Sequence, residues 1–173
     1  VRIGAGEGRG RALRAPRGRA VRPTPARVRD ALFQILSPRL PGARVLDLFA
    51  GTGALGIEAL SRGAAYAVFV DRAPASGAAV RENLARAGFA ARGTVRVEDV
   101  RRAVARLRRE GQRFHLIVAD PPYEQGWGAR LLQALGDGAL LEPGGLVIVE
   151  HSRREELPER EANLVRMQQR RYG

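Results

Sequence analysis

A segment of four residues combines an acid, two prolines and an aromatic ring, in the order Asp120-Pro121-Pro122-Tyr123. It follows the apolar run 114–119, which is typical of a buried parallel strand. The prolines fix their own φ angles and remove two backbone donors, so the segment is a stiff turn at the carboxyl end of that strand. An acid at the start of such a turn and an aromatic ring at its end can hold a flat, nitrogen-bearing ring. The segment therefore indicates base-modifying chemistry, and its four residues are the catalytic candidates.

A glycine-rich segment leaves another predicted strand and enters a predicted helix, over residues 47–56. Its G-x-G-x-x-G spacing alone suggests a dinucleotide site or a tight turn with no ligand. Asp47 argues against a dinucleotide, because a carboxylate beside the turn repels a pyrophosphate and attracts the sulfonium and ammonium groups of S-adenosylmethionine. Glycines also let the backbone approach such a ligand closely. We therefore expect S-adenosylmethionine as the cofactor, with these residues of the turn around it: Asp47, Phe49, Ala50, Gly51, Thr52 and Gly53.

Two more acids stand where later strands are predicted to end. Asp71, followed by Arg72, can accept hydrogen bonds from the ribose hydroxyls of an adenosine. Asp99, followed by Val100, can accept from the adenine amino group. Each acid alone reads equally well as a helix cap. Together with Asp47 they place three acids at the carboxyl ends of successive strands, where open α/β sheets bind ligands, so we add both pairs to the predicted cofactor site.

Strand and helix patterns alternate from residue 44 onward, which predicts a parallel sheet with right-handed crossovers. Ahead of them, Thr24-Pro25 predicts the capped start of a helix that Ser37-Pro38 ends. The expected fold class is α/β, with a Rossmann-like, mostly parallel central sheet and helices on both faces. The predicted strands are Val45–Phe49, Tyr66–Val70, Thr94–Val97, Phe114–Ala119 and Leu146–Glu150, and the predicted helices lie near 54–62, 75–87, 100–110 and 127–136.

The first 24 residues differ from the rest in composition. They are rich in glycine and arginine, with Ile3 and Leu13 as sparse apolar points, and they predict a basic arm or loose hairpin. Residues 25–173 then form the one expected domain, since 173 residues with 45% hydrophobic content suffice for a single core. No apolar stretch approaches the length of a membrane span, so we expect no membrane contact. The chain has no cysteine, which excludes disulfides and cysteine metal sites, and we expect a cytoplasmic protein without a metal.

Positive charge is in excess, with 30 Lys+Arg against 18 Asp+Glu and a formal net charge of +12. Every one of these cations is arginine, which a GC-rich genome can explain, but such a bias does not explain the excess. Arginine suits phosphate oxygens and stacks on bases, and the arm holds many arginines beside the single acid Glu7. The distribution favours a nucleic acid partner, and the predicted contacts are Arg9, Arg11, Arg22, Thr24 and Arg27.

Taken together, the glycine turn, the acids and the Asp120–Tyr123 segment resemble class I S-adenosylmethionine-dependent amino-methyltransferases. More narrowly, Arg22–Phe33 (RPTPARVRDALF) and Leu46–Gly63 (LDLFAGTGALGIEALSRG) are similar to the motifs of the RsmD family, and the likeness runs over nearly the whole chain. That resemblance implies methylation of N2 of a guanine in bacterial small-subunit (16S) ribosomal RNA. Two departures stand out: Asp71 replaces the usual glutamate, and the sequence ends before the family's last strand, so we expect an incomplete end to the sheet.

The resemblance also implies how the segment acts. Asp120 and the carbonyl of Pro121 would accept the two hydrogens of the guanine amine, while Tyr123 stacks on the base. Methyl transfer would then be in line and helped mainly by positioning, without a covalent enzyme intermediate or a metal. The implied partner is ribosomal RNA or the small ribosomal subunit, and we expect a monomer.

Three other functions remain open at this stage. A DNA adenine-N6 methyltransferase could present its amine to the same segment, although 173 residues leave little room for a domain that reads a duplex. A catalytically silent RNA-binding protein on the same fold is disfavoured, because the predicted acids and the Asp120–Tyr123 segment are intact. A dinucleotide oxidoreductase comes last, for the electrostatic reason given at Asp47.

Overall fold

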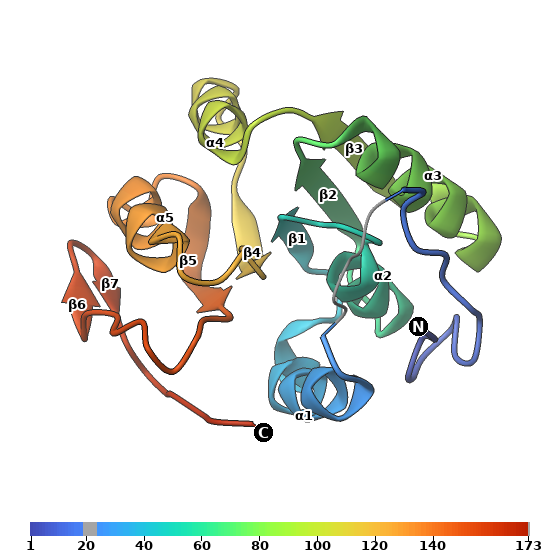
Figure 1. The fold of residues 1–173 in the computed structure, drawn as a ribbon, viewed down its shortest axis with the longest axis horizontal. Coiled ribbons are helices and arrows are strands. Elements are labelled where there is room, and N and C mark those ends of the chain that lie inside the picture. The colour runs from blue at the N-terminus through green and yellow to red at the C-terminus, as the bar shows by residue number, and fades with distance from the viewer. Residues whose placement is uncertain (19–23, 173) are drawn as a thin grey trace.

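The centre of the molecule is a five-stranded sheet in which every neighbouring pair of strands is parallel (Figure 1). The structure, a computed structural model, describes residues 1–18 and 24–172. The strand order is β3-β2-β1-β4-β5, so the chain reverses its direction of travel across the sheet between β1 and β4. Such a switch point is where open α/β sheets bind ligands. The strands are β1 (Arg44–Leu48), β2 (Tyr66–Asp71), β3 (Gly93–Val97), β4 (Phe114–Ala119) and β5 (Leu141–Val149).

Helices cover both faces of this sheet (Figure 1). Because alternate strand residues point to opposite sides, each face has its own core cluster. On one face, Val45 and Phe69 pack in one core cluster with side chains of α1, α2 and α3. On the other, Leu46 and Val68 pack in a second cluster with side chains of α4 and α5. The helices are α1 (Ala26–Leu36), α2 (Ala54–Ser61), α3 (Pro74–Ala87), α4 (Val100–Arg109) and α5 (Trp127–Leu135), with short 3-10 turns η1 (Ser37–Arg39) and η2 (Ala90–Arg92).

The fold confirms the expected α/β architecture, and two local features, the start of β5 and the cap of α1, differ from the expectation. The strand predicted over 146–150 begins at Leu141, because Leu141 pairs with Phe114 before residues 142–145 interrupt the register. The last strands, β6 (Arg160–Glu161) and β7 (Leu164–Val165), pair only with each other among the described residues. They form a small antiparallel hairpin outside the five-stranded sheet (Figure 1).

The predicted cap of the first helix is wrong. Pro25 occupies the cap position of α1, and no side chain makes a capping hydrogen bond there. The hydroxyl of Thr24 instead bonds to two carboxyl groups at the carboxyl edge of the sheet. A hydroxyl before a proline fits a helix start in sequence, but here the Thr24 hydroxyl donates its hydrogen bonds to tertiary partners.

The N-terminal arm is a hairpin-like loop that lies against α2 and α3 (Figure 1). Residues 2 and 12 form an antiparallel bridge, and Ile3 and Leu13 are buried in the same core cluster as α1 to α3. Glu58 of α2 is 1% exposed, and its carboxylate accepts hydrogen bonds from the backbone amides of Gly4 and Ala5. The arm is therefore held by buried contacts on the side of the sheet that carries α2. None of the helices in residues 1–18 and 24–172 is long and apolar enough to cross a membrane.

Candidate active site

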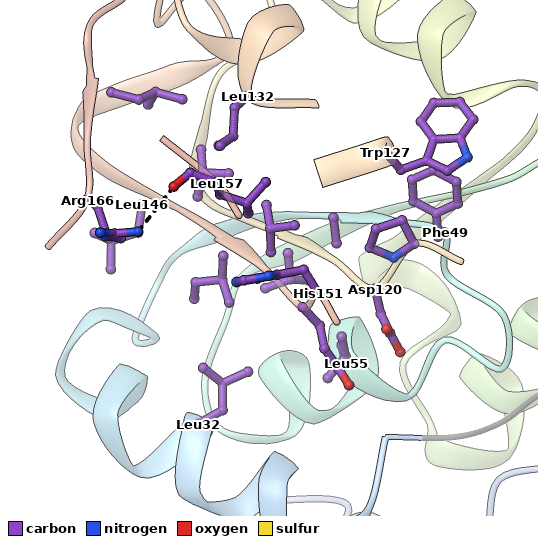
Figure 2. A pocket seen from close by; sticks show the side chains of 18 of the residues that line it. Leu32, Phe49, Leu55, Asp120, Trp127, Leu132, Leu146, His151, Leu157 and Arg166 are labelled. Carbon is purple, nitrogen blue, oxygen red and sulfur yellow. Dashed lines mark hydrogen bonds between the residues drawn. The ribbon is translucent and has the colours of Figure 1, made fainter. Parts of the chain in front are cut away.

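A large cleft opens along the carboxyl edge of the sheet, with a volume of about 1820 Å³. Its walls include strand ends of β1, β2, β4 and β5, the start of α1, and the chain after β7. Figure 2 shows Asp120 in this cleft, with Leu32 of α1 and Leu146 of β5 on its walls. Of the residues predicted to act, those that line the cleft are Thr24, Arg27, Phe49, Gly51, Asp71, Arg72, Asp99, Val100, Asp120, Pro121, Pro122 and Tyr123.

The side chain of Asp120 lies within a small group of polar side chains at this edge. The Thr24 hydroxyl donates to Oδ2 of Asp120 at 3.1 Å and to Oε2 of Glu150 at 3.2 Å. The hydroxyl of Tyr123 donates to the other oxygen of Glu150, Oε1, at 2.8 Å. Backbone pairing sets this arrangement, because the amide of Glu150 donates to the carbonyl of Ala119, immediately before Asp120. Two carboxyl groups from neighbouring strand ends are thereby joined through one hydroxyl.

The environment of Asp120 changes its acidity. Burial and the negative charge of Glu150 raise the pKa of Asp120 to about 7, and the hydrogen bond from Thr24 opposes that rise. A carboxyl group with a pKa near neutrality is a stronger base than an ordinary aspartate once it is ionised. Asp120 is therefore suited both to accept a hydrogen bond from an amine and to take up its proton.

Asp47, the acid of the glycine turn, lies beneath the carboxyl edge of the sheet and does not line the cleft. Asp47 is 1% exposed, and its Oδ2 accepts from the amide of Gly56 at 2.9 Å, which fixes the start of α2 to β1. Burial raises its pKa well above the usual range, and the nearby charges of Asp120 and Asp71 add to this. The other turn residues away from the cleft wall are Ala50, Thr52 and Gly53.

Gly51 and Gly56 each have a conformational or packing reason to be glycine. Gly51 has a φ of 58°, in the left-handed region, and its amide donates to Oδ2 of Asp71 at 3.0 Å. A Cβ at Gly56 would lie 2.4 Å from Cε1 of Phe69, so glycine there lets α2 lie close against β2. Only the first of these two glycines faces the cleft.

Asp71 and Asp99 both line the cleft, and both also make local hydrogen bonds. Oδ1 of Asp71 accepts from the amide of Ala73 at 2.9 Å, and its Oδ2 accepts from the amide of Gly51 at 3.0 Å. Asp99 is the N-cap of α4, since its Oδ1 accepts from the amide of Arg101 at 2.9 Å. These hydrogen bonds fix both carboxylates at neighbouring strand ends.

Two aromatic rings pack together on the opposite wall of the cleft from α1. Phe49 and Trp127 meet edge to face with their centroids 5.0 Å apart, as Figure 2 shows. Phe49 has a φ of 59°, an uncommon value for a residue with a bulky side chain. The guanidinium of Arg130 lies over the Trp127 ring, 5.3 Å from its centroid. The strained backbone at Phe49 thus aims an aromatic ring along the wall that Asp99 and Val100 continue.

The structure separates the residues predicted to contact nucleic acid. Thr24 and Arg27 line the cleft, and the side chain of Arg27 is exposed. Arg11 donates to the carbonyl of Ala87 at the carboxyl end of α3. Because α3 runs antiparallel to the strands it connects, that end lies toward the opposite edge of the sheet. Arg9 is exposed on the same arm, and Arg22 lies outside the described residues.

Glu150 is the functional candidate that sequence reasoning missed. It directly follows β5, and the sequence does show an acid at the end of a predicted strand. What the sequence does not show is that β5 pairs with β4, which brings Glu150 beside Asp120. Across residues 1–18 and 24–172, no three His, Asp or Glu side chains are grouped in a way that could hold a metal ion.

Comparisons with known proteins agree on one family. The sequence model of the family described as conserved hypothetical protein 95 matches residues 1–173. A putative rRNA methyltransferase of Bacillus subtilis is 37% identical over 100% of this chain and 94% of its own length. The ribosomal RNA small subunit methyltransferase D of Escherichia coli is 37% identical over 94% of this chain and 80% of its own length. The solved structure of a putative methyltransferase from Escherichia coli superposes with a TM-score of 0.79 at 35% identity, covering 91% of this chain and 85% of the other. That superposition confirms the expected Rossmann-like methyltransferase fold.

Proposed function

The chain belongs to the family described as conserved hypothetical protein 95, and from this premise we propose that it methylates N2 of a guanine in bacterial small-subunit ribosomal RNA, with S-adenosylmethionine as the donor. Its relatives named rRNA methyltransferases support the reaction class and the kind of RNA. The single observation that carries the proposal is the cleft, which joins the Asp120–Tyr123 segment to the predicted cofactor edge. Such an enzyme would act as a cytoplasmic monomer, with residues 25–173 as its catalytic domain and residues 1–24 as an accessory arm.

The residues at the cofactor edge fit S-adenosylmethionine better than a dinucleotide. Asp47, Asp71 and Asp120 lie close enough that the charges of the last two raise the pKa of Asp47. Asp71 and Asp99 line the cleft, and their carboxylates favour a ligand with positive sulfonium and ammonium groups and disfavour a pyrophosphate. Asp71 would accept from the ribose hydroxyls, Asp99 from the adenine amine, and Gly51 would allow close backbone approach. When bound, S-adenosylmethionine supplies an electrophilic methyl group.

The protein's contribution to transfer is to position and polarise the amine. The lone pair of a guanine amine is delocalised into the ring, so the amine is a weak nucleophile. Asp120 and the carbonyl of Pro121 would accept its two hydrogens and favour a pyramidal nitrogen. Tyr123 would stack on the base, with its hydroxyl held by Glu150 at 2.8 Å. Asp120, whose pKa is about 7, would then receive the released proton.

The test is to identify the labelled nucleoside. The protein is incubated with methyl-labelled S-adenosylmethionine and, in separate reactions, with unmodified small-subunit RNA, assembled small subunits and DNA. The expected product is N2-methylguanosine in one of the two RNA samples. N6-methyladenine in the DNA sample would instead establish the adenine-N6 alternative, and label in none of the samples would favour the silent RNA-binding alternative.

A calorimetric control separates cofactor binding from turnover. Wild-type protein should bind S-adenosylmethionine and not NAD, because the carboxylate-rich edge opposes a pyrophosphate. Asp120→Ala should keep its affinity for S-adenosylmethionine within about tenfold and lose at least about 10²-fold in methyl transfer, the range that one positioned acid–base group supplies. Tight NAD binding, or full turnover by Asp120→Ala, would contradict the proposed function.

A further inference from the structure

The carboxyl group of Glu150 is a second acceptor beside Asp120. Oδ2 of Asp120 and Oε2 of Glu150 share the hydroxyl of Thr24, at 3.1 Å and 3.2 Å. Both side chains line the same cleft, and they leave adjacent strands at the same height of the sheet. A base held by Asp120 would therefore place the atom next to its amine against Glu150.

Two partly buried carboxyl groups at such close range oppose each other. Burial raises the pKa of Asp120 most, and the negative charge of Glu150 and a hydrogen bond to the Glu150 carboxylate raise it further. Among the described residues, the hydroxyls of Thr24 and Tyr123 donate to the two carboxyl groups, which together carry more lone pairs than these two donors occupy. The arrangement is completed by a ligand that presents two hydrogen-bond donors side by side.

The Watson–Crick edge of guanine offers that arrangement, and the edge of adenine does not. In guanine the N2 amine stands next to N1–H, so two neighbouring positions donate. In adenine the N6 amine stands next to an unprotonated N1, whose lone pair would face a carboxylate. An unpaired acceptor set against a buried acceptor is strongly disfavoured.

We propose that Glu150 accepts the N1–H of the target guanine while Asp120 holds the N2 amine, so that Glu150 selects guanine against adenine. This inference rests on the proposed function and adds a specificity-determining residue to it. Thr24 donates to one oxygen of each carboxyl group before the base enters, and the remaining lone pairs can accept the two donors of guanine. The hydroxyl of Tyr123 donates to the other oxygen of Glu150, Oε1, so Oε2 is the oxygen shared with Thr24.

The test uses a base that keeps the amine and loses the neighbouring donor. 2-Aminopurine carries an amine at C2, but its N1 is unprotonated. Once the labelling experiment has located the target guanosine, small subunits are assembled with RNA that carries either guanine or 2-aminopurine at that position. The ratio of their methylation rates is compared among variants, so the intrinsic reactivity of the two bases cancels.

Wild-type protein should methylate guanine at least about 10²-fold faster than 2-aminopurine, since a buried acceptor rejects an analogue that lacks the donor. Glu150→Gln should narrow that ratio to about tenfold or less, because an amide can donate to an unprotonated N1 and accept from N1–H. Glu142→Gln is the matched control, since Glu142 lies on β5 and lines the same cleft. It should keep the wild-type ratio.

Tyr123→Phe tests whether the rate ratio depends on the carboxylate of Glu150 itself or on the contact between Glu150 and Tyr123. It removes the hydroxyl that contacts Glu150 and leaves the carboxylate, so the ratio should stay near that of the wild type even if both rates fall. A variant too slow to turn over is compared by equilibrium binding of the two RNAs. An unchanged ratio in Glu150→Gln, an equal narrowing in Tyr123→Phe, or a wild-type ratio near one would overturn the inference. If wild-type protein labels no guanosine, the proposed function itself falls.

Discussion

Asp120 illustrates the conflict between stability and function at a single residue. Its pKa in the folded protein is about 7, against an ordinary value of 3.8. The folded state therefore binds more protons than the unfolded state between those two pH values, and stability falls as pH rises through that interval. Above about pH 7 the folded protein carries a partly buried Asp120 carboxylate beside Glu150. The ionised carboxyl group suits Asp120 to base modification, but its partial burial lowers the stability of the fold.

Asp120→Asn should accordingly raise stability and abolish activity. At pH 8 the amide removes a charge that burial and Glu150 disfavour, and it can still accept from Thr24, so we expect a gain of about 2 kcal/mol in the free energy of unfolding. At pH 4 the gain should largely vanish, because Asp120 is protonated there in the folded protein. Denaturant unfolding at both pH values measures the difference.

The matched control for this prediction is Asp137→Asn. Asp137 is exposed and pairs with Arg108, so its substitution should change stability by no more than about 0.5 kcal/mol at either pH. If Asp120→Asn were destabilising at pH 8, the carboxylate would have a stabilising partner that these contacts do not include.

At the scale of elements, the N-terminal arm depends on one buried acid of α2. Besides the amides of Gly4 and Ala5, the carboxylate of Glu58 contacts Nε of Arg29 at 3.2 Å and Nε of Arg62 at 3.4 Å. The side chains of Glu58 and Arg29 are 1% and 5% exposed. The pair therefore ties the arm, α1 and α2 together.

Glu58→Ala should be strongly destabilising, because it leaves the Arg29 guanidinium buried without its carboxylate. Removing one partner of a buried ion pair costs about 3–5 kcal/mol, and denaturant unfolding measures it. Hydrogen exchange should also accelerate at the amides of Ile3 and Leu13. Glu82→Ala is the control, since Glu82 makes exposed pairs with Arg14 and Arg86, and it should cost less than about 1 kcal/mol. Equal losses in the two variants would contradict the anchoring role of Glu58.

The elements themselves were largely predictable, and the contacts between them were not. Strand Phe114–Ala119 was predicted to the residue because a buried parallel strand is an uninterrupted apolar run. The start of β5 differs from the prediction because Pro143, Gly144 and Gly145 are turn-forming residues, yet Leu141 still pairs with Phe114. Thr24 fits a helix cap in the sequence, because the local sequence gives no sign of the distant carboxyl groups that accept its hydrogen bonds. The position of Glu150 beside Asp120 depends likewise on strand order, which periodicity does not encode.

At the scale of the whole molecule, the exposed arginines are spread over several elements and are not confined to the arm. The net charge is +12, and exposed arginines stand on α1, α4 and α5 as well as on residues 1–18. Arg27 of α1 and Arg130 of α5 line the cleft that holds Asp120. Arg11, in contrast, is engaged with the carbonyl of Ala87 toward the opposite edge of the sheet. An RNA whose guanine enters the cleft must pass the first pair, whereas contact with the arm requires it to extend around α2 and α3.

These positions predict different salt dependences for two pairs of substitutions. Arg27→Ala with Arg130→Ala should weaken binding of small-subunit RNA and reduce the magnitude of the negative slope of log affinity against log salt by about 1.5, since each lost phosphate contact removes about 0.7–0.9. Arg9→Ala with Arg11→Ala removes the same charge. If RNA binds at the cleft rim, this pair should reduce the magnitude of the slope by less than half as much. Fluorescence anisotropy across a salt series measures both slopes, and thermal unfolding checks that Arg11→Ala keeps the arm in place. A larger fall for the arm pair would instead make residues 1–18 the main RNA-binding surface, as the clustering of arginines in the sequence suggests.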